Sequence, residues 1–393
     1  ASYINETIAN IIREYYLTEE DISNRHNLIK SVCEFYDNIK DDYITKNQLW
    51  FLYHISNLIG IPQYFDMLIK YRNDENFNIN YLSATTLSDM IYNSSLAVDE
   101  DKFLHKYQKE VIDNFSNYKT NRYFLTAPTS FGKTFIVYEV VKKMNYKNVV
   151  FIYPTLSLLS ENYIKILKDQ FFDDYQIYTL SDTKIDLSQK NLCIYTPERF
   201  LSMMDRNREL KFDFIFMDEV YKIDNQFIID NETVGENERD TAFRVALQTA
   251  CLSSKDLLLA GPFIQIPEGI TESSINNFLN DNEFKVLEYN DVEIVNKELL
   301  TINNNASYCI DKIDFLINKK DKNSRLLIVL DELNRNDNSS IVYTYSRYNA
   351  EQLAKKLADA REDITEPILE NMSESMRRFY IFKDHINHIF GEA

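Results

Sequence analysis

The sequence predicts an α/β fold with a mostly parallel sheet, preceded by an all-helical region. From residue 103 onward, short runs rich in β-branched and aromatic residues alternate with helical patterns, which is typical of a parallel sheet wrapped by helices. One of these runs ends in a Gly-Lys-Thr turn and another in an Asp-Glu pair. Since ligands bind beyond the carboxyl ends of parallel strands, both groups are expected at one edge of the sheet.

Residues 1–100 are expected to form a helical accessory domain. Isoleucines recur at helical spacing over residues 4–12, and similar apolar patterns cover residues 28–39 and 50–71. The aromatic side chains in these patterns are interpreted as core, and no residue of this region is assigned a chemical role. The acidic run at residues 99–101 marks the expected boundary with the next domain.

The next domain is expected to span residues 101–296 and to contain one complete sheet. Each predicted strand is a short apolar run bounded by polar or helical sequence. The predicted strands are residues 122–126, 148–153, 176–180, 191–195, 213–217 and 256–260.

Residues 297–393 are expected to begin a second sheet domain without completing it. The pattern predicts one strand with its following helix, after two earlier helices. The predicted elements are helices at 309–318 and 324–334, a strand at 340–345 and a helix that includes residues 348–354.

A strand and a phosphate-binding loop are predicted within residues 122–134. In such a loop the backbone amides converge on an anion, Gly132 permits its close approach, Lys133 reaches the outer phosphates and Thr134 holds Mg²⁺. The chain has only 6 glycines, so a glycine directly before Lys-Thr is a specific signal. The sequence therefore predicts a nucleotide site, whose loop residues are Ala127, Pro128, Thr129, Ser130, Phe131, Gly132, Lys133 and Thr134.

Asp218 and Glu219 directly follow the predicted strand 213–217. Nucleotide hydrolysis needs one carboxylate to hold the metal and a second to orient or deprotonate the attacking water. Asp218 fits the metal role and Glu219 the water role. An acidic pair after a strand is weak on its own, but it becomes a strong signal downstream of a phosphate loop in an α/β pattern.

Together these residues resemble the superfamily 2 helicases and translocases of the DEAD/DEAH-box type. Residues 127–134 resemble their first motif, and Asp218-Glu219-Val220-Tyr221 resembles their second. The resemblance covers residues 101–355. Within the superfamily, residues 218–296 resemble the Ski2-like branch, where an acidic insertion and a helix, here Arg239–Cys251, precede motif III. The resemblance implies RecA-like domains, ATP and Mg²⁺ as cofactors, and nucleic acid as partner.

The resemblance also implies roles for residues outside these two motifs. Gln108, in Leu104-His105-Lys106-Tyr107-Gln108, occupies the position that reads the adenine base. Thr155 lies in the counterpart of motif Ia, and Thr196 and Arg199 lie in that of motif Ib. In the family both motifs contact the sugar–phosphate backbone of one strand, and such contacts carry no sequence readout. Ser346-Arg347 resembles the opening of the second motor domain, and the Tyr-Gln form of the adenine element favours DNA over RNA.

Several departures from the family pattern bear on activity. Ala127 stands in place of the first glycine of the loop, and Tyr221 replaces the usual histidine or aspartate. Motif III, usually Ser-Ala-Thr, is Ala260-Gly261-Pro262. The hydroxyls that help couple hydrolysis to strand movement in the family are absent, which disfavours unwinding more than hydrolysis. The second domain's glycine-rich and paired-arginine motifs do not occur. Since an arginine finger contributes about 10³–10⁵ in rate in related sites, we expect a fragment that binds ATP and hydrolyses it slowly.

Composition limits the classes of protein. The net charge is −18, from 43 basic and 61 acidic residues, so a polyanion would be held by a local groove rather than by the whole surface. The four cysteines and five histidines show no zinc-ligand spacing beyond the isolated pair His385 and His388. No apolar run approaches the roughly 20 residues that cross a bilayer. A cytoplasmic protein without membrane contact is expected.

The sequence thus favours the ATP-dependent motor portion of a helicase or translocase. Nucleic acid, with DNA favoured, is the expected partner, and an effector protein subunit is a further candidate. The Ski2-like branch includes repair, RNA-processing and phage-defence helicases, among them the Hachiman helicase subunit. The helical N-terminus and the divergent motif III are compatible with defence. The alternative is an ATP-dependent switch or scaffold that uses the same fold without unwinding, which the altered motif III and the acidic surface favour.

Overall fold

The structure is a computed structural model in which the chain forms two compact units, residues 1–296 and 297–393. The larger sheet lies in the first unit. The residues that the structure describes are 2–41, 43–72, 83–99, 102–207, 209–220, 234–262, 274–295, 297, 300–303, 306–310, 313–318, 321–334, 340–344 and 346–359.

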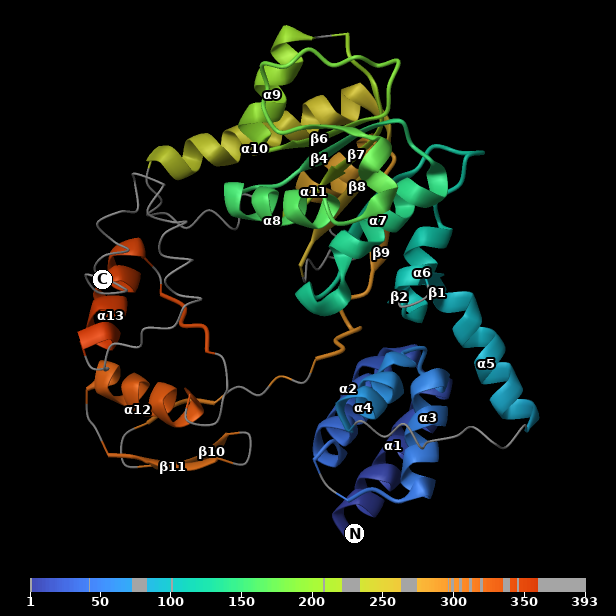
Figure 1. Cartoon of the computed structure of the whole chain (residues 1–393), viewed down its shortest axis with the longest axis vertical. Helices are drawn as coiled ribbons and strands as arrows, with labels where there is room; N and C mark the ends of the chain where they lie inside the picture. The colour runs from blue at the N-terminus through green and yellow to red at the C-terminus, as the bar shows by residue number, and fades with distance from the viewer. Residues whose placement is uncertain are drawn as a thin grey trace. The chain divides into compact units, whose positions relative to one another are not determined.

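Helices make up almost all of the described N-terminal region, as the apolar periodicity predicts. Leu28, Val32 and Phe35 of one helix and Leu52 and Leu68 of its neighbours are buried, so a continuous apolar core holds the bundle together. We call residues 2–96 the helical region; it is drawn in blue to cyan in Figure 1. Its helices are α1 (Ser2–Glu20), α2 (Arg25–Ile39), α3 (Lys46–Leu58), α4 (Gln63–Arg72) and α5 (Ala84–Leu96).

A seven-stranded sheet forms the centre of the first unit, and all its paired strands run parallel. The strand order is β5-β6-β4-β7-β8-β3-β9. The six predicted strands are confirmed with small shifts at their ends, whereas β9 was not predicted. The strands are β3 (Arg122–Thr126), β4 (Asn148–Ile152), β5 (Gln176–Tyr178), β6 (Asn191–Tyr195), β7 (Phe212–Met217), β8 (Ser254–Gly261) and β9 (Lys285–Glu288).

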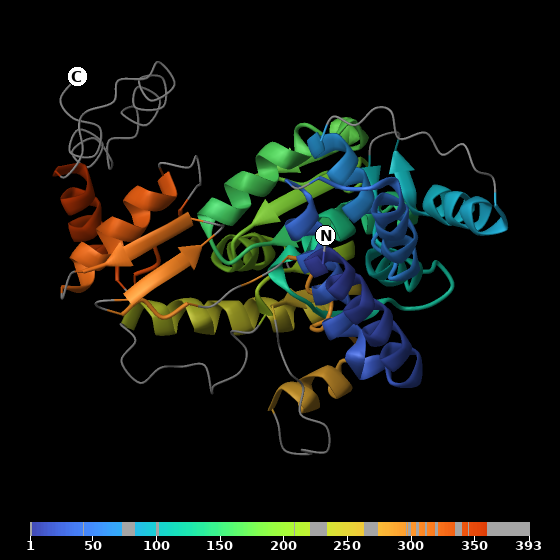
Figure 2. The same ribbon diagram turned by 90° about the horizontal axis from the view of Figure 1, so that it is seen from below.

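Helices cover both faces of the sheet. Leu125 of β3 joins the core formed with α7 and α8, while its neighbour Phe124 joins the core formed with α9 and α10, because successive strand residues point to opposite faces. Figure 2 shows α8 and α10 on opposite sides of the strands. These helices are α7 (Lys133–Met144), α8 (Leu156–Ile166), α9 (Pro197–Arg206) and α10 (Val234–Ser253), followed later by α11 (Ser274–Asp281).

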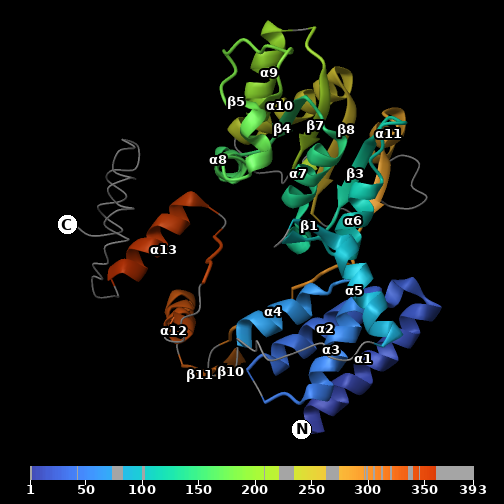
Figure 3. The ribbon, with the colours of Figure 1, turned by 45° about the vertical axis from the view of Figure 1, so that its right-hand side comes forward.

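Helix α6 (Lys106–Asp113) lies between the helical region and the sheet (Figures 1 and 3). It follows a short antiparallel pair, β1 (Ala97–Asp99) and β2 (Lys102–Phe103). The backbone N–H of Lys106 donates to Gly60 O at 2.9 Å, and the Tyr107 hydroxyl donates to Ile59 O at 3.1 Å. Gly60 has φ +83°, and a Cβ there would lie 2.5 Å from Lys106 Cβ. Only glycine permits this close approach.

The second unit corrects one of the C-terminal predictions. Residues 309–318 were predicted to be helical, but β10 (Ala306–Ile310) and β11 (Ile313–Ile317) form an antiparallel pair. Phe315 and Ile317 are buried whereas Asp314 and Leu316 are exposed, so the apolar period is two rather than 3.6. The predicted helix at 324–334 is confirmed as α12 (Lys322–Asn334).

The strand predicted at 340–345 is not formed by residues 340–344. Ile341 and Tyr343 are 99% and 90% exposed, so these β-forming side chains have no surface to pack against, and strand propensity depends on such packing. The helix predicted around residues 348–354 is confirmed as α13 (Arg347–Asp359). Among the helices that the structure describes, none is both long and apolar enough to span a membrane.

We predict that Gly60→Ala destabilises the protein by about 1–3 kcal/mol, because the new methyl group meets Lys106 and the backbone keeps a left-handed conformation. Urea unfolding measures the change. Leu58→Ala is the matched control, since Leu58 is 56% exposed in the same turn, and its unfolding free energy should change by less than about 0.5 kcal/mol. Equal stability of the Gly60 variant and the parent chain would contradict the close contact.

Candidate active site

The predicted nucleotide residues meet at one edge of the sheet. The loop of residues 127–132 follows β3, Asp218 follows β7, and β8 lies between these two strands. Because all three strands are parallel, their carboxyl ends share this edge. Motif III residue Gly261 ends β8, and its carbonyl accepts the Ala127 N–H at 3.3 Å. The altered motif III therefore directly borders the phosphate loop.

Lys133 is buried at the start of α7, with 9% of its surface exposed. Its ammonium donates to the carbonyl oxygens of Ala127 and Pro128, at 2.9 and 3.0 Å. Burial lowers the pKa of Lys133, and the nearby carboxylates of Asp218 and Glu219 partly oppose this shift. The structure thus brings the lysine and the acidic pair together. An anion at the loop would strengthen the charged form of the lysine.

The turn before Lys133 has the shape of an anion-binding loop. Residues Thr129–Phe131 form a single 3₁₀ turn, and Gly132 follows in the left-handed conformation with φ +80°. Thr134 is half-buried in the first turn of α7, and a helix N-terminus favours the binding of anions such as phosphate. The buried Ser130 Oγ has no hydrogen-bond partner among the described residues. These features fit a nucleotide triphosphate with Mg²⁺.

Asp218 and Glu219 differ in environment. Asp218 is 9% exposed, and its Oδ1 accepts the Glu219 N–H at 2.9 Å. Burial raises the pKa of Asp218, against opposing effects of that N–H and of Lys133. Glu219 is half-buried and has φ +58°. This conformation is uncommon for a residue other than glycine and is often found at functional sites.

Gln108 faces the phosphate loop. Its side-chain amide donates to Phe131 O at 2.9 Å, and its Oε1 accepts the His105 N–H at 3.0 Å. A Cβ at Gly132 would lie 2.6 Å from Gln108 Nε2, which is the flexible end of that side chain, so the positive φ of Gly132 is the main reason for glycine at this position. The observed bonds of Gln108 cap α6 and anchor the loop. Its reading of adenine stays a prediction.

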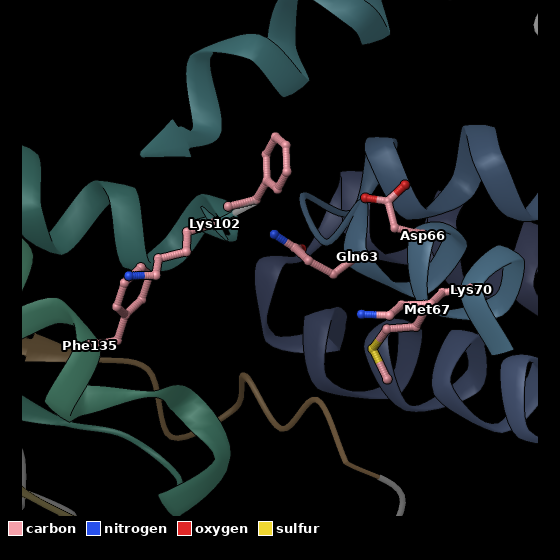
Figure 4. Close-up of a pocket in the computed structure, with 7 residues that line it drawn as sticks. Gln63, Asp66, Met67, Lys70, Lys102 and Phe135 are labelled. Atoms are coloured by element: carbon pink, nitrogen blue, oxygen red, sulfur yellow. The ribbon is translucent and has the colours of Figure 1, made fainter. Parts of the chain in front are cut away.

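A pocket of about 430 Å³ opens beside the first turn of α7 (Figure 4). Phe135, which directly follows Thr134, and Lys102 lie on one side, and residues of α4 lie on the other. The lining combines aromatic, amide and cationic side chains, which suits a planar polar ring. Gln63, Asp66, Met67, Lys70, Lys102, Phe103 and Phe135 line the pocket. The helical region therefore contributes a wall beside the phosphate loop, which the sequence did not indicate.

The residues predicted to grip nucleic acid lie on two neighbouring strand ends of the same edge. Thr155 follows β4 and accepts the Leu158 N–H at 3.3 Å as the cap of α8. Thr196 follows β6 and caps α9 in the same way. Arg199 is half-buried, and its guanidinium donates to Thr179 O at 2.9 Å. Each residue has a structural role, and their contacts with nucleic acid stay predictions.

Other predicted features are absent from, or lie outside, the described residues. Tyr221, His385 and His388 belong to parts that the structure does not describe. In the described part, no group of three or more histidine, cysteine or acidic side chains could hold a metal.

The sequence patterns gave no indication of Tyr289, which stacks on Phe131 with ring centroids 5.3 Å apart. Tyr289 follows the unpredicted strand β9, and no motif marks it.

Comparisons with known proteins indicate the class to which this chain is similar. Residues 101–247 match the family described as type III restriction enzyme, res subunit. The chain is 29% identical over 146 residues to anti-bacteriophage protein B of Escherichia coli, a match covering 37% of this chain and 19% of that protein. It is 27% identical over 268 residues to ATP-dependent DNA helicase Hel308 of Methanococcus vannielii, covering 63% and 33%.

Among solved structures, the Sulfolobus solfataricus SWI2/SNF2 ATPase core in complex with dsDNA matches with a TM-score of 0.32 and 20% identity. That match covers 41% of this chain and 32% of the other. The chain spans about a fifth to a third of the length of the two curated relatives.

A parallel sheet with a phosphate loop after β3 and a buried carboxylate after β7 defines a P-loop domain of the RecA-like type. The matches to known proteins indicate which class of RecA-like domain this is. This is a helicase-like ATPase domain of the superfamily 2 type, and the resemblance to that superfamily is confirmed.

We predict that Asp218→Asn stabilises the ligand-free protein at neutral pH. The folded-state pKa of Asp218 is raised by burial, so the folded state favours the protonated form, and stability is lost as the pH rises through that pKa. The asparagine removes this loss. Its advantage in urea unfolding should be constant at pH values above the raised pKa and shrink as the pH falls through that pKa toward the ordinary pKa of an aspartate. A variant less stable than the parent at neutral pH would contradict this account.

Proposed function

We propose that this chain is the ATP-binding motor portion of a DNA helicase or translocase. The observation that supports this most is that the buried amine of Lys133, bound to two loop carbonyls, lies at the same sheet edge as Asp218 and Glu219. A cation and an acidic pair on opposite sides of one site suit a phosphate chain with its metal. One relative is named a DNA helicase, which supports DNA over RNA.

ATP with Mg²⁺ would supply the reactive phosphoryl group at this site. Lys133 would neutralise the outer phosphates, and the amides of residues 129–132 would surround them. Thr134 and Asp218 would hold the metal. Glu219 would orient and deprotonate the attacking water, a role in which a positioned base contributes about 10²–10⁴ in rate.

The base would enter the pocket beside α7. Phe135 directly follows the metal-binding Thr134, so the pocket lies within one helical turn of the phosphate site. Its aromatic side chains can stack on a planar ring, and its volume lies within the range of small-molecule sites.

A nucleic-acid strand would cross the ends of β4 and β6. Thr155 and Thr196 lie at helix N-termini there, and Arg199 adds a positive charge. Such contacts bind phosphates and do not read the bases.

A role in defence is supported by the name of one relative, anti-bacteriophage protein B. An effector protein subunit would then be a further partner.

A second candidate function is an ATP-dependent switch. It is favoured by Ala260-Gly261-Pro262 at the end of β8, next to the phosphate loop. The hydroxyls that help couple hydrolysis to strand movement in the family are missing from these three residues. ATP could then alter a partner surface without unwinding.

Stimulation by nucleic acid distinguishes the two functions. We predict that single-stranded DNA raises the steady-state ATPase rate of the full-length protein, and that Arg199→Ala raises the DNA concentration needed for half-stimulation. Arg206→Ala, at the far end of the same helix, is the control. Absence of stimulation by both DNA and RNA would reject the motor and favour the switch.

Glu219→Gln should separate binding from turnover. The amide keeps the shape of the side chain but cannot take a proton, so the ATPase rate should fall about 10²–10⁴-fold while the Kd for Mg·ATP stays within about twofold. Single-turnover hydrolysis and equilibrium nucleotide binding measure the two quantities. Undiminished turnover would exclude Glu219 as the base.

A further inference from the structure

The phosphate loop is held by aromatic contacts, and one of the rings, that of Tyr289, belongs to no predicted motif. Phe131, the residue before Gly132, has 0% of its surface exposed. Its ring stacks on Tyr289 at 5.3 Å with an interplanar angle of 26°, and it meets the His105 ring edge-on at 4.9 Å. Phe131 also offers its carbonyl to Gln108. The backbone position of the loop therefore depends on how firmly Phe131 is held.

Tyr289 is itself fixed from two directions. Its N–H donates to Thr126 O at 2.8 Å, which attaches it to the end of β3 just before the loop. Its hydroxyl donates to the Glu110 carboxylate of α6 at 3.2 Å, and its ring lies 6.0 Å from that of Tyr107. Tyr289 thus joins strand, helix and loop at one point.

The helical region binds the residues that follow Tyr289 through an ion pair and a hydrogen bond. Arg25 of α2 makes a bidentate ion pair with Asp291, with both N···O distances 2.7 Å, and its guanidinium lies 4.8 Å above the Tyr107 ring. Farther along, Ile294 O accepts the Tyr64 hydroxyl of α4 at 2.9 Å. A bidentate, partly buried pair of this kind fixes geometry better than an exposed one. We call residues 289–295 the bracing segment.

We propose that Tyr289 and Arg25 are positioning residues for the phosphate loop, and that the helical region thereby sets the affinity of the loop for triphosphate. The inference rests on the proposed ATP site and adds to it a dependence on residues far from the motifs. Neither side chain is assigned a contact with the nucleotide. Each acts through Phe131, by limiting the conformations of the loop before the anion arrives.

The physical effect is pre-organisation. A loop that occupies its binding conformation for only a fraction of the time binds with its intrinsic Kd divided by that fraction. Loosening the bracing segment lowers the fraction and raises Kd and KM. The chemical step changes little, because Asp218 and Glu219 follow β7, and two strands, β8 and β3, lie between β7 and the strand β9 that precedes Tyr289. A split between KM and kcat is the signature.

The test measures Kd for Mg·ATP and for inorganic triphosphate, together with urea unfolding, on the full chain. Tyr289→Leu and Arg25→Ala should each raise both constants about tenfold, as expected when the competent fraction falls to a tenth. Tyr289→Phe keeps the stacking ring and should stay within about twofold of the parent. Inorganic triphosphate is included because it has no base. An effect on ATP alone would place the defect in the base pocket and overturn the proposal.

Phe284→Leu is the matched control for lost aromatic packing. Phe284 precedes β9 as Tyr289 follows it, and it stacks on Phe278 at 6.0 Å on the other side of the sheet. This variant should lose stability while keeping the parent Kd. If it raises Kd as much as Tyr289→Leu does, the effect is a general loss of packing and the proposal fails.

Arg25→Lys is a second variant, for use if Arg25→Ala does not fold. It keeps the charge without the bidentate pair, so its Kd should lie between those of the parent and of a variant without the pair. A parent-like Kd from Arg25→Lys would count against the role of Arg25.

Lys133→Ala separates this proposal from the function on which it rests. Loss of triphosphate binding in that variant, with parent-like Kd values for Tyr289→Leu and Arg25→Ala, would overturn the role of the bracing segment alone. Undiminished binding in Lys133→Ala would reject the nucleotide site itself.

Discussion

The arrangement of the first unit depends on the contacts of α6 with two turns that contain glycine. On one side Lys106 lies against Gly60 of the helical region, and on the other Gln108 lies against Gly132 of the phosphate loop. Both glycines have positive φ. A Cβ at Gly60 would lie 2.5 Å from Lys106 Cβ, whereas a Cβ at Gly132 would meet only the end of the Gln108 side chain, at 2.6 Å from Nε2. The contact at Gly60 leaves little room for α6 to shift relative to the helical region, because packed interiors do not deform continuously. At the loop, the hydrogen bond from the Gln108 side chain to Phe131 O provides the link. The helical region and the phosphate loop are thus connected through the short helix α6, which contacts both of them.

The charges of the site are costly until a ligand is bound. Burial disfavours the charged forms of both Lys133 and Asp218, and each only partly relieves the other. A site of this kind trades stability for binding, as functional sites commonly do. The left-handed Glu219 adds backbone strain at the same place. Metal and phosphate would supply the missing opposite charges, so ligand binding and folding stability should be linked.

Local sequence patterns predicted the strands, the helices around them and the loop, because burial on both faces and turn chemistry leave a direct mark on residue type. These patterns gave wrong or incomplete predictions where the structure depends on contacts between segments that are not local in sequence. Residues 309–318 carry apolar residues that suit either helix or strand, and pairing with residues 306–310 settled the matter. The bracing segment could not be foreseen, since the link from Arg25 to Asp291 joins positions 266 residues apart. Gln108 was singled out, but its bonds to His105 and Phe131 depend on packing that a motif does not contain.

The acidic composition need not oppose binding of a polyanion at the proposed strand-binding edge. Net charge acts at long range and is screened within about 8 Å at physiological ionic strength, whereas helix N-termini act at contact distance. Helices α8 and α9 both begin at the ends of neighbouring strands β4 and β6, each capped by a threonine. A phosphate backbone laid along these ends would meet two helix N-termini and Arg199 while the negative surface elsewhere remained solvated. Binding of this kind would be selective for the edge and weak elsewhere, so the charge of −18 would suppress non-specific contacts rather than the specific one.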